Sequence, residues 1–289
     1  MIPAPFDYHA PTSLGEALSL LSSLGPDAKI LTGGQSLLPM MKLRLAEPEH
    51  IIDLNGIPDL DYIREEDGVL SIGALVREAD LAASDLVRSQ LPIIHDTGAH
   101  IADPQVRNLG TLAGNLAHGD PGNDHPATMM ALDAHVVATG PGGHRTLDVR
   151  SLFVDFYETA LADDEILTEI RIQLPPASSG GAYLKLERKV GDYATVGVAA
   201  QVTFGADGRC TAAGIGLTNV AHVPVHAEAA GKRLVGTSCS EGDTAAAADL
   251  AADASSPSSD LRGPADYKRA MVRVLTRRAL GRAIERARA

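Results

Sequence analysis

Lys29-Ile-Leu-Thr-Gly-Gly-Gln-Ser36 carries a short apolar run into a pair of glycines, and Asn108-Leu-Gly-Thr-Leu-Ala-Gly-Asn115 is a second glycine-bearing stretch. Glycine allows positive φ and lets a ligand approach the main chain without a Cβ in the way. Successive exposed amides in such a turn form an anion-binding nest. Either turn alone is explained as a simple tight turn. Two such turns together fit the diphosphate of a dinucleotide.

Strands alternate with helices around these turns. Ser13 with Glu16 forms a capping box for a helix over 13–24, which ends at Gly25. Asp67-Gly68 lies between two strand-like runs and predicts a hairpin. We predict strands at 29–31, 50–54, 62–64, 69–72, 134–139, 145–149 and 166–172, and helices at 77–100, with a break near Pro92, and at 126–133.

Pro175-Pro-Ala-Ser-Ser-Gly-Gly181 has the composition of a linker. Beyond it, Asp207-Gly208 separates two of three strand-like runs, which predicts an antiparallel meander followed by helices. The expected strands are 182–188, 194–204 and 209–217, and the expected helices are 227–235, 242–253 and 264–287. The fold class is therefore α+β. We expect one domain over 1–174, with subdomains of about 1–57 and 58–174, and a second domain over 178–289.

Composition excludes several classes of function. A net charge of −12 argues against general nucleic-acid binding. No apolar run reaches the roughly 18–20 residues of a transmembrane segment, and the N-terminus lacks signal-peptide features, so we expect a cytoplasmic protein. Cys210 and Cys239 are too few to ligate an iron–sulfur cluster, and we expect two buried, inert thiols. Residues 267–289 hold eight Lys/Arg and one acid, which fits a solvated helix face or a contact with an acidic partner subunit.

No Rossmann, P-loop, nucleophile-elbow or C-x-x-C motif is present. His118-Gly-Asp-Pro-Gly-Asn-Asp-His125 holds metal-ligand residue types, but its proline and glycines favour an irregular loop in which Asp124 accepts hydrogen bonds from sugar hydroxyls. Lys185 alternates with leucines on a strand, so it is either solvent-exposed or a counter-charge for a phosphate or a reduced flavin. Tyr193 is an exposed or stacking aromatic. We find no metal site and no catalytic residue.

Four motifs in register resemble the FAD-binding flavoproteins of the molybdopterin dehydrogenases, the xanthine-oxidase-type molybdenum hydroxylases. Thr32–Arg44 is similar to the first FAD motif of this family, and Ile101–Asn115, continued by Gly119–Asp124, is similar to the second. Lys185–Ala194 and Gly216–Val220 resemble the C-terminal domain of carbon monoxide dehydrogenase medium subunits. The resemblance covers nearly the entire chain.

The resemblance implies a vanillyl-alcohol-oxidase-like (PCMH-type) domain of two α/β subdomains that hold FAD, followed by a three-stranded antiparallel sheet with C-terminal helices. Ala113 replaces the first of two usual glycines, and Gln35 stands where carbon monoxide dehydrogenases often have histidine. By the resemblance, the cofactor-binding residues are Thr32, Gly33, Gly34, Gln35, Ser36, Leu37, Ile101, Thr111, Leu112, Ala113, Gly114, Asn115, Asp124, Leu167, Lys185 and Tyr193.

The resemblance also implies an electron-transfer role. A small subunit with two [2Fe–2S] clusters would pass electrons to the FAD of this chain, and a large subunit with the molybdenum cofactor would oxidise the substrate, in a dimer of heterotrimers. The reaction that the resemblance implies is aerobic carbon monoxide oxidation. The acceptor would be a quinone or another compound, and the complex could contact the inner face of the membrane. The alternatives are the flavin subunit of a hydroxylase for a purine, aldehyde or N-heterocycle, and a free-standing flavin-binding or assembly protein.

Overall fold

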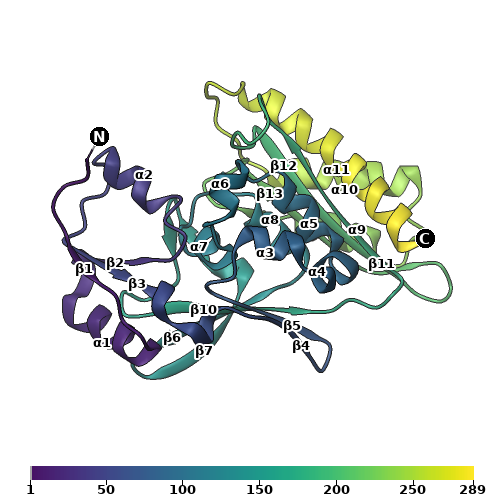
Figure 1. The fold of residues 1–289 in the computed structure, drawn as a ribbon. Helices are drawn as coiled ribbons and strands as arrows, with labels where there is room; N and C mark the ends of the chain where they lie inside the picture. Colours follow the sequence, from purple (N-terminus) through teal and green to yellow (C-terminus); the bar gives the residue numbers. More distant parts are fainter. Residues whose placement is uncertain (1) are drawn as a thin grey trace.

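The chain builds three main sheets in succession (Figure 1). The structure is a computed structural model, and it describes residues 2–289. The first sheet lies at one end of the molecule, and the third sheet with its helices lies at the other. Mixed α and β structure is therefore confirmed, with the sheets arranged along the chain in sequence order.

The first sheet is parallel, in the order β1-β3-β2. Helix α1 packs against it and begins at Ser13, whose side chain accepts a hydrogen bond from the Glu16 amide. Gly25 ends this helix with a φ of 66°, so the predicted N-cap and stop signal are confirmed. The reciprocal half of the predicted capping box is absent, because the Glu16 carboxylate accepts a hydrogen bond from the Thr12 amide and not from the Ser13 amide. The elements are β1 (Asp7–His9), α1 (Leu14–Leu24), β2 (Ala28–Leu31), α2 (Leu37–Lys42) and β3 (His50–Asp53).

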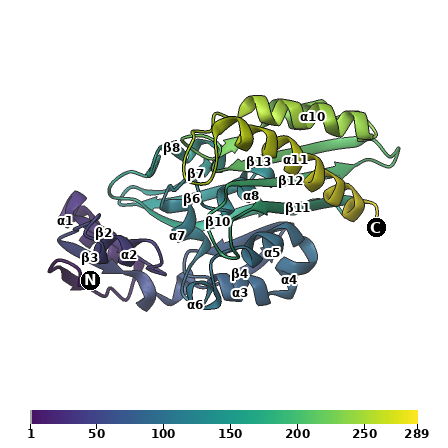
Figure 2. The same cartoon turned by 90° about the horizontal axis from the view of Figure 1, so that it is seen from above.

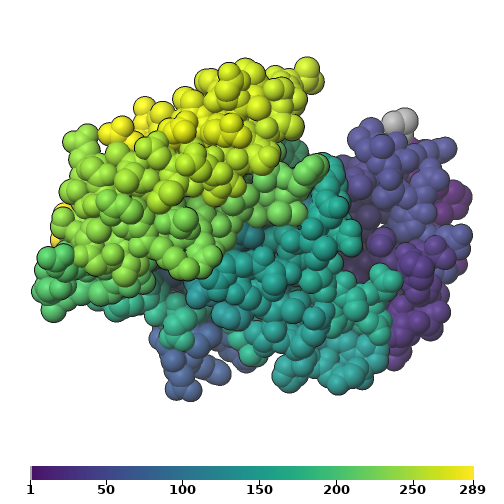
Figure 3. Space-filling view, turned by 180° about the vertical axis from the view of Figure 1, so that it is seen from behind, coloured from purple at the N-terminus to yellow at the C-terminus, as the bar shows by residue number. Residues whose placement is uncertain are grey.

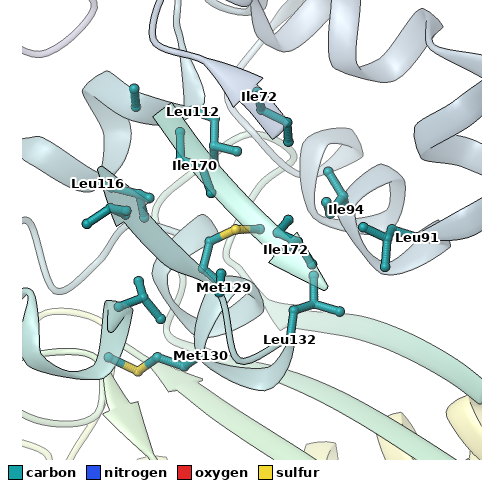
Figure 4. Close-up of a cluster of buried hydrophobic side chains, with 14 of the residues drawn as sticks. Ile72, Leu91, Ile94, Leu112, Leu116, Met129, Met130, Leu132, Ile170 and Ile172 are labelled. Carbon is teal, nitrogen blue, oxygen red and sulfur yellow. The ribbon is translucent and has the colours of Figure 1, made fainter. Parts of the chain in front are cut away.

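The second sheet is antiparallel, in the order β4-β5-β10-β6-β7. Short helices cover it, and their apolar side chains form the largest core, part of which Figure 4 shows. The strands are β4 (Ile63–Glu66), β5 (Val69–Gly73), β6 (His135–Gly140), β7 (Gly143–Asp148) and β10 (Ile166–Gln173), with a side hairpin of β8 (Phe153–Asp155) and β9 (Glu158–Thr159). The helices are α3 (Glu78–Ala83), α4 (Asp85–Gln90), α5 (Pro92–Ala99), α6 (Pro104–Arg107), α7 (Leu112–Ala117) and α8 (His125–Ala131).

The third sheet lies between two helical layers (Figures 1 and 2). Glycines permit both contacts, because a Cβ on Gly180 would be 2.2 Å from the Ala283 carbonyl of α11 and one on Gly216 would be 1.9 Å from the Ala127 carbonyl of α8. The strands are β11 (Ser179–Leu186), β12 (Val196–Phe204), β13 (Cys210–Thr218) and β14 (Val225–His226), and the helices are α9 (Glu228–Leu234), α10 (Glu241–Ala254) and α11 (Ala265–Ala287). Short 3-10 turns occur at Gly25–Asp27, Leu54–Gly56, Pro58–Leu60 and Val149–Ser151.

Several predicted elements differ from the structure. The third sheet has four strands rather than three, because the two residues of β14 follow Pro224 and were too few to show a pattern. The helix predicted over 77–100 is three helices, since Ser84 caps a second one and Pro92 begins a third. The predicted linker is shorter, because 179–181 belong to β11. Its glycines serve close packing there.

The cysteines and the basic residues of the last helix have their contacts within this chain. Cys210 and Cys239 are buried free thiols, as predicted. The basic residues of α11 largely find acids of this chain: Arg273 pairs with Asp249, and Arg282 and Arg286 both pair with Asp96. Within residues 2–289, no helix combines the length and apolarity that a membrane crossing needs.

Candidate functional site

A cavity of about 690 Å³ opens where the first sheet, the second sheet and the third sheet meet. Seen from behind, the N-terminal part (purple) and the teal part of the chain are separated by a notch (Figure 3). The first sheet contributes β2 and the turn after it, the second contributes the 101–124 segment and β10, and the third contributes Lys185 and Tyr193. This size is in the range of sites for large organic ligands.

The two glycine turns lie against each other at this cavity. The hydroxyls of Thr32 and Thr111 are 3.0 Å apart and share a hydrogen bond. A Cβ on Gly33 would be 2.2 Å from the carbonyl oxygen of Leu109, and one on Gly114 would be 2.9 Å from the Thr32 hydroxyl oxygen. Any larger residue at either glycine would therefore push the turns apart. Turns separated by almost 80 positions in the sequence form one continuous wall.

The main-chain amides of the first turn have no hydrogen-bond acceptor within the described chain. Gly34 has a φ of 69°, which only glycine adopts readily. Within residues 2–289 no group accepts a hydrogen bond from the amides of Gly33, Gly34, Gln35 or Ser36. On the second turn, the Asn115 side-chain oxygen is buried and has no partner in the described part of the chain. Unpartnered polar groups around a hollow are the arrangement expected of a polar ligand site.

Two residues that the sequence did not identify hold the turns together. The Asn55 side-chain amide donates to the Thr32 carbonyl at 2.9 Å. Arg77 donates to the Asn55 side-chain oxygen and to the Leu109 carbonyl, both at 2.5 Å. A chain of hydrogen bonds therefore runs from the first turn to the second. Neither residue carries a sequence signal for this role, and only the tertiary fold brings them together.

At the far end of the cavity, Asp124 at the start of α8 accepts two hydrogen bonds from β11. Tyr183 donates to one carboxylate oxygen at 2.5 Å and Lys185 donates to the other at 2.8 Å. The Lys185 side chain is only 1% exposed. The expectation of a solvent-exposed lysine is therefore wrong, because strand alternation shows which residues share a face but not which face is buried.

Burial controls the electrostatics of this end. It raises the pKa of Asp124, while the Lys185 ammonium and the Tyr183 hydroxyl lower it in part. Burial and the neighbouring Asp124 raise the pKa of Tyr183 well above its usual value. Tyr193 is 49% exposed and lines the cavity, and burial of its hydroxyl end also raises its pKa. These phenols are neutral donors at physiological pH.

A second tyrosine stands at the cavity edge. Tyr157 donates to Asp120 at 3.2 Å, and its ring lies 5.1 Å from that of His118. Burial and Asp120 raise the pKa of Tyr157 to about 12, and burial lowers the pKa of His118. The polar residues of the 118–125 loop have separate partners: His125 bonds Glu78 at 2.8 Å, Asp120 bonds Tyr157 and Asp124 bonds Lys185. Tyr157 was missed because the hairpin that carries it is too short to predict.

Fifteen of the sixteen predicted cofactor residues line the same cavity. They are Thr32, Gly33, Gly34, Gln35, Ser36, Leu37, Ile101, Thr111, Ala113, Gly114, Asn115, Asp124, Leu167, Lys185 and Tyr193. Leu112 differs: its side chain is fully buried in the largest core, as Figure 4 shows, because it is the first residue of α7 and points to the second sheet. Ala113 is 3% exposed and also packs into that core.

Comparison with known proteins decides the family. Residues 4–175 match the FAD binding domain in molybdopterin dehydrogenase, and residues 181–283 match the CO dehydrogenase flavoprotein C-terminal domain. The chain belongs to the molybdopterin-dehydrogenase flavoproteins. It is an oxidoreductase subunit with an FAD-binding domain, and its fold is the PCMH type followed by an antiparallel sheet with helices.

The family relatives are similar over their full length. The carbon monoxide dehydrogenase medium chain of Afipia carboxidovorans is 50% identical over 287 residues, which cover 99% of both chains. A crystal structure of Cu,Mo-CO dehydrogenase superposes with a TM-score of 0.96 at 50% identity, covering 99% of this chain and 100% of that one. Quinoline 2-oxidoreductase from Pseudomonas putida 86 superposes with a TM-score of 0.93 at 35% identity, covering 100% of both chains.

The residues present fit FAD. Gly33 and Gly114 allow the two turns to approach each other closely, and the amides of Gly33, Gly34, Gln35 and Ser36 donate to no protein group within residues 2–289. Asn115 offers an unpartnered buried oxygen, and Lys185 supplies a positive charge at the opposite end. Such a site provides donors for a diphosphate and a cation for a ring that becomes negative on reduction.

Proposed function

We propose that this chain is the FAD-binding medium subunit of a molybdenum hydroxylase that oxidises carbon monoxide. The observation that carries the proposal is the joint wall of the Thr32 and Thr111 turns, which supports one diphosphate from both sides. The full-length similarity to medium chains of carbon monoxide dehydrogenases supports the substrate. We also propose the division into domains over 1–174, with a boundary near 57, and 178–289.

Each proposed site residue has one task. The turn residues Thr32–Leu37 and Thr111–Asn115 bind the diphosphate and ribityl part, with Leu112 contributing only main chain. Ile101 and Leu167 give apolar contacts, Tyr193 covers the ring, and Asp124 with Lys185 forms the charged end. FAD, when bound, accepts electrons singly or in pairs and so links one-electron clusters to a two-electron acceptor. No side chain of this cavity needs to transfer a proton to the primary substrate.

The partners follow from the same proposal. A small subunit with [2Fe–2S] clusters would donate electrons, a large subunit with the molybdenum cofactor would oxidise the substrate, and a quinone or another acceptor would receive the electrons. A dimer of heterotrimers is the expected assembly. Location in the cytoplasm, with contact to the inner membrane face through the complex, stays a prediction that cell fractionation tests.

The test is anaerobic reduction of the native complex. We expect carbon monoxide to bleach the flavin absorption of the complex and to leave the isolated chain unchanged. Bleaching by a purine, aldehyde or N-heterocycle but not by carbon monoxide would favour another hydroxylase, a candidate that the similarity to quinoline 2-oxidoreductase supports. Purification of the native chain without iron–sulfur and molybdenum subunits would favour a free-standing flavin protein.

A further inference from the structure

One carboxylate joins two side chains of the same strand beneath the cavity. Tyr183 and Lys185 are two positions apart on β11, so they share one face of the sheet. Both bind Asp124, through different oxygens, at 2.5 Å and 2.8 Å. The side chains of all three are nearly inaccessible, with 8% of the Asp124 side chain exposed and 1% of that of Lys185.

The surroundings leave the Tyr183 hydroxyl a single position. Gly197 of β12, which pairs with Lys185 in the sheet, has no side chain, and a Cβ there would be 2.4 Å from the Tyr183 hydroxyl oxygen. The ring of His100 lies edge-on at 5.9 Å from the Tyr183 ring. A buried hydroxyl costs free energy unless it has a partner, so phenylalanine would suffice if this position needed only packing. The hydroxyl therefore acts on Asp124.

We infer that Tyr183 is a positioning residue: its hydroxyl fixes the Asp124 carboxylate so that the second carboxylate oxygen holds the Lys185 ammonium at the cavity wall. Asp124 then serves first as the counter-ion of Lys185 and only second as a contact of the ligand. The functional consequence rests on the proposed FAD site, because Lys185 lies at the end of the cavity that also carries Tyr193.

Lys185 has a limited set of other partners. Its ammonium donates to the His100 carbonyl at 3.1 Å and lies 3.6 Å from one oxygen of Glu187, an atom without a hydrogen-bond partner in the described chain. Without Asp124 the ammonium would move toward Glu187 and away from the Asp124 side. The Tyr183–Asp124 bond therefore determines where the positive charge stands. A charge held in a fixed position stabilises a ligand's negative charge more than a mobile one, because no side chain has to be reoriented when the ligand charge develops.

The pH dependence of this arrangement follows from Asp124. Burial raises the pKa of Asp124, and the Tyr183 hydrogen bond lowers it in part. A group whose pKa is raised on folding contributes stability at low pH that is lost as pH rises through the folded-state pKa. Loss of the Tyr183 hydroxyl raises that pKa further and enlarges the loss. The defect of a Tyr183→Phe variant is therefore larger when the Asp124 carboxyl is ionised than when it is protonated.

Other titratable groups surround the pair. His100 after α5, His125 of α8, and Glu187 and Tyr193 in the loop after β11 face it, and Glu78 of α3 bonds His125. They are unchanged in the variant, so they contribute equally to both proteins in a difference measurement. A titration that belongs to Asp124 must also disappear when Asp124 is replaced by asparagine.

The experiment compares melting temperature at pH 5 and pH 8, together with FAD affinity, for the native complex and its variants. Tyr8→Phe is the matched control, because Tyr8 also donates to an aspartate, Asp53, at 2.6 Å, but on the exposed surface. We expect Tyr183→Phe to weaken FAD binding by roughly tenfold, the lower end of the range for one hydrogen bond to a charged group, and to lower the melting temperature most where Asp124 is ionised. Tyr8→Phe should resemble the wild type in both measurements.

Asp124→Asn supplies the second arm. In an Asp124→Asn background, Tyr183→Phe should lower the melting temperature equally at both pH values. Equal deficits in FAD affinity and melting temperature for Tyr183→Phe in the wild-type and Asp124→Asn backgrounds would overturn the inference. If Tyr183→Phe does not fold, Asp124→Asn alone decides, because an FAD affinity equal to that of the wild type would also overturn the inference. If the wild type binds no FAD, the proposed function is refuted. The melting temperatures of the variants then still test the role of Tyr183.

Discussion

Replacing Gly33 with alanine separates the two turns that form the cavity wall. The added Cβ would stand 2.2 Å from the Leu109 carbonyl oxygen and 2.7 Å from the Gly110 Cα. Ordinary contact begins near 3.4 Å, so the turns must separate by about 1 Å, an overpacking that typically costs about 1–3 kcal/mol. The first turn follows β2 and the second leads from α6 into α7, so the free chain relieves the strain by moving them apart.

A diphosphate shared by the two turns can bind only when the turns are in contact. Bringing them into contact restores the clash of the added Cβ, and this strain weakens binding. We expect the dissociation constant for FAD to rise roughly tenfold to hundredfold, while the melting temperature without FAD changes little. Fluorescence titration of the flavin-depleted complex with FAD measures the change. Gly15→Ala is the matched control, because no atom lies within 4 Å of its Cβ position. Wild-type affinity in Gly33→Ala would refute the argument that these turns act as one wall.

Three further predictions concern the frame of the site and the core. Asn55→Ala removes the amide that ties the first turn to the second and should weaken FAD binding by about 1 kcal/mol, roughly fivefold, in the same titration. Asp96→Ala leaves two α11 arginines without their ion pair and should lower the free energy of unfolding in urea by about 1–3 kcal/mol. Asp85→Ala breaks an exposed pair and should lower it by less than about 1 kcal/mol. Equal losses for the two variants would contradict this. Burial raises the pKa of Cys210 to about 12, and Cys239 is 7% exposed. Neither thiol should therefore react with iodoacetamide at pH 8 before denaturation. A carbamidomethyl group on either cysteine of the native chain, detected by mass spectrometry, would contradict this.

The local parts of the site could be predicted from the sequence. Glycines in the Thr32 and Thr111 turns are required by contacts and by a positive φ at Gly34, and such requirements leave a pattern within a few residues. The cap of α1 at Ser13 is equally local. That both turns belong to one site came from the family resemblance and not from their spacing. Their direct contact through the Thr32 and Thr111 hydroxyls was not predicted.

The long-range parts could not be predicted. Asn55 and Arg77 bind the turns through hydrogen bonds that span different elements, and neither residue type is unusual at its position. Lys185 alternates with leucines, a pattern that does not reveal that α5 and α8 cover its side of β11. Leu112 lies within a binding motif but points into the core, because the first residue of a helix can offer its main chain to one side and its side chain to the other. Helix α2 escaped prediction because Pro39 lies inside its six residues.

The FAD content of the native protein tests the central claim most directly. The chain should be purified from its own source together with any subunits that accompany it, and its visible spectrum and acid-released flavin should be measured against chain concentration. The account predicts the absorption of oxidised flavin and an FAD content equimolar with the chain. A colourless preparation that also takes up no added FAD would contradict it.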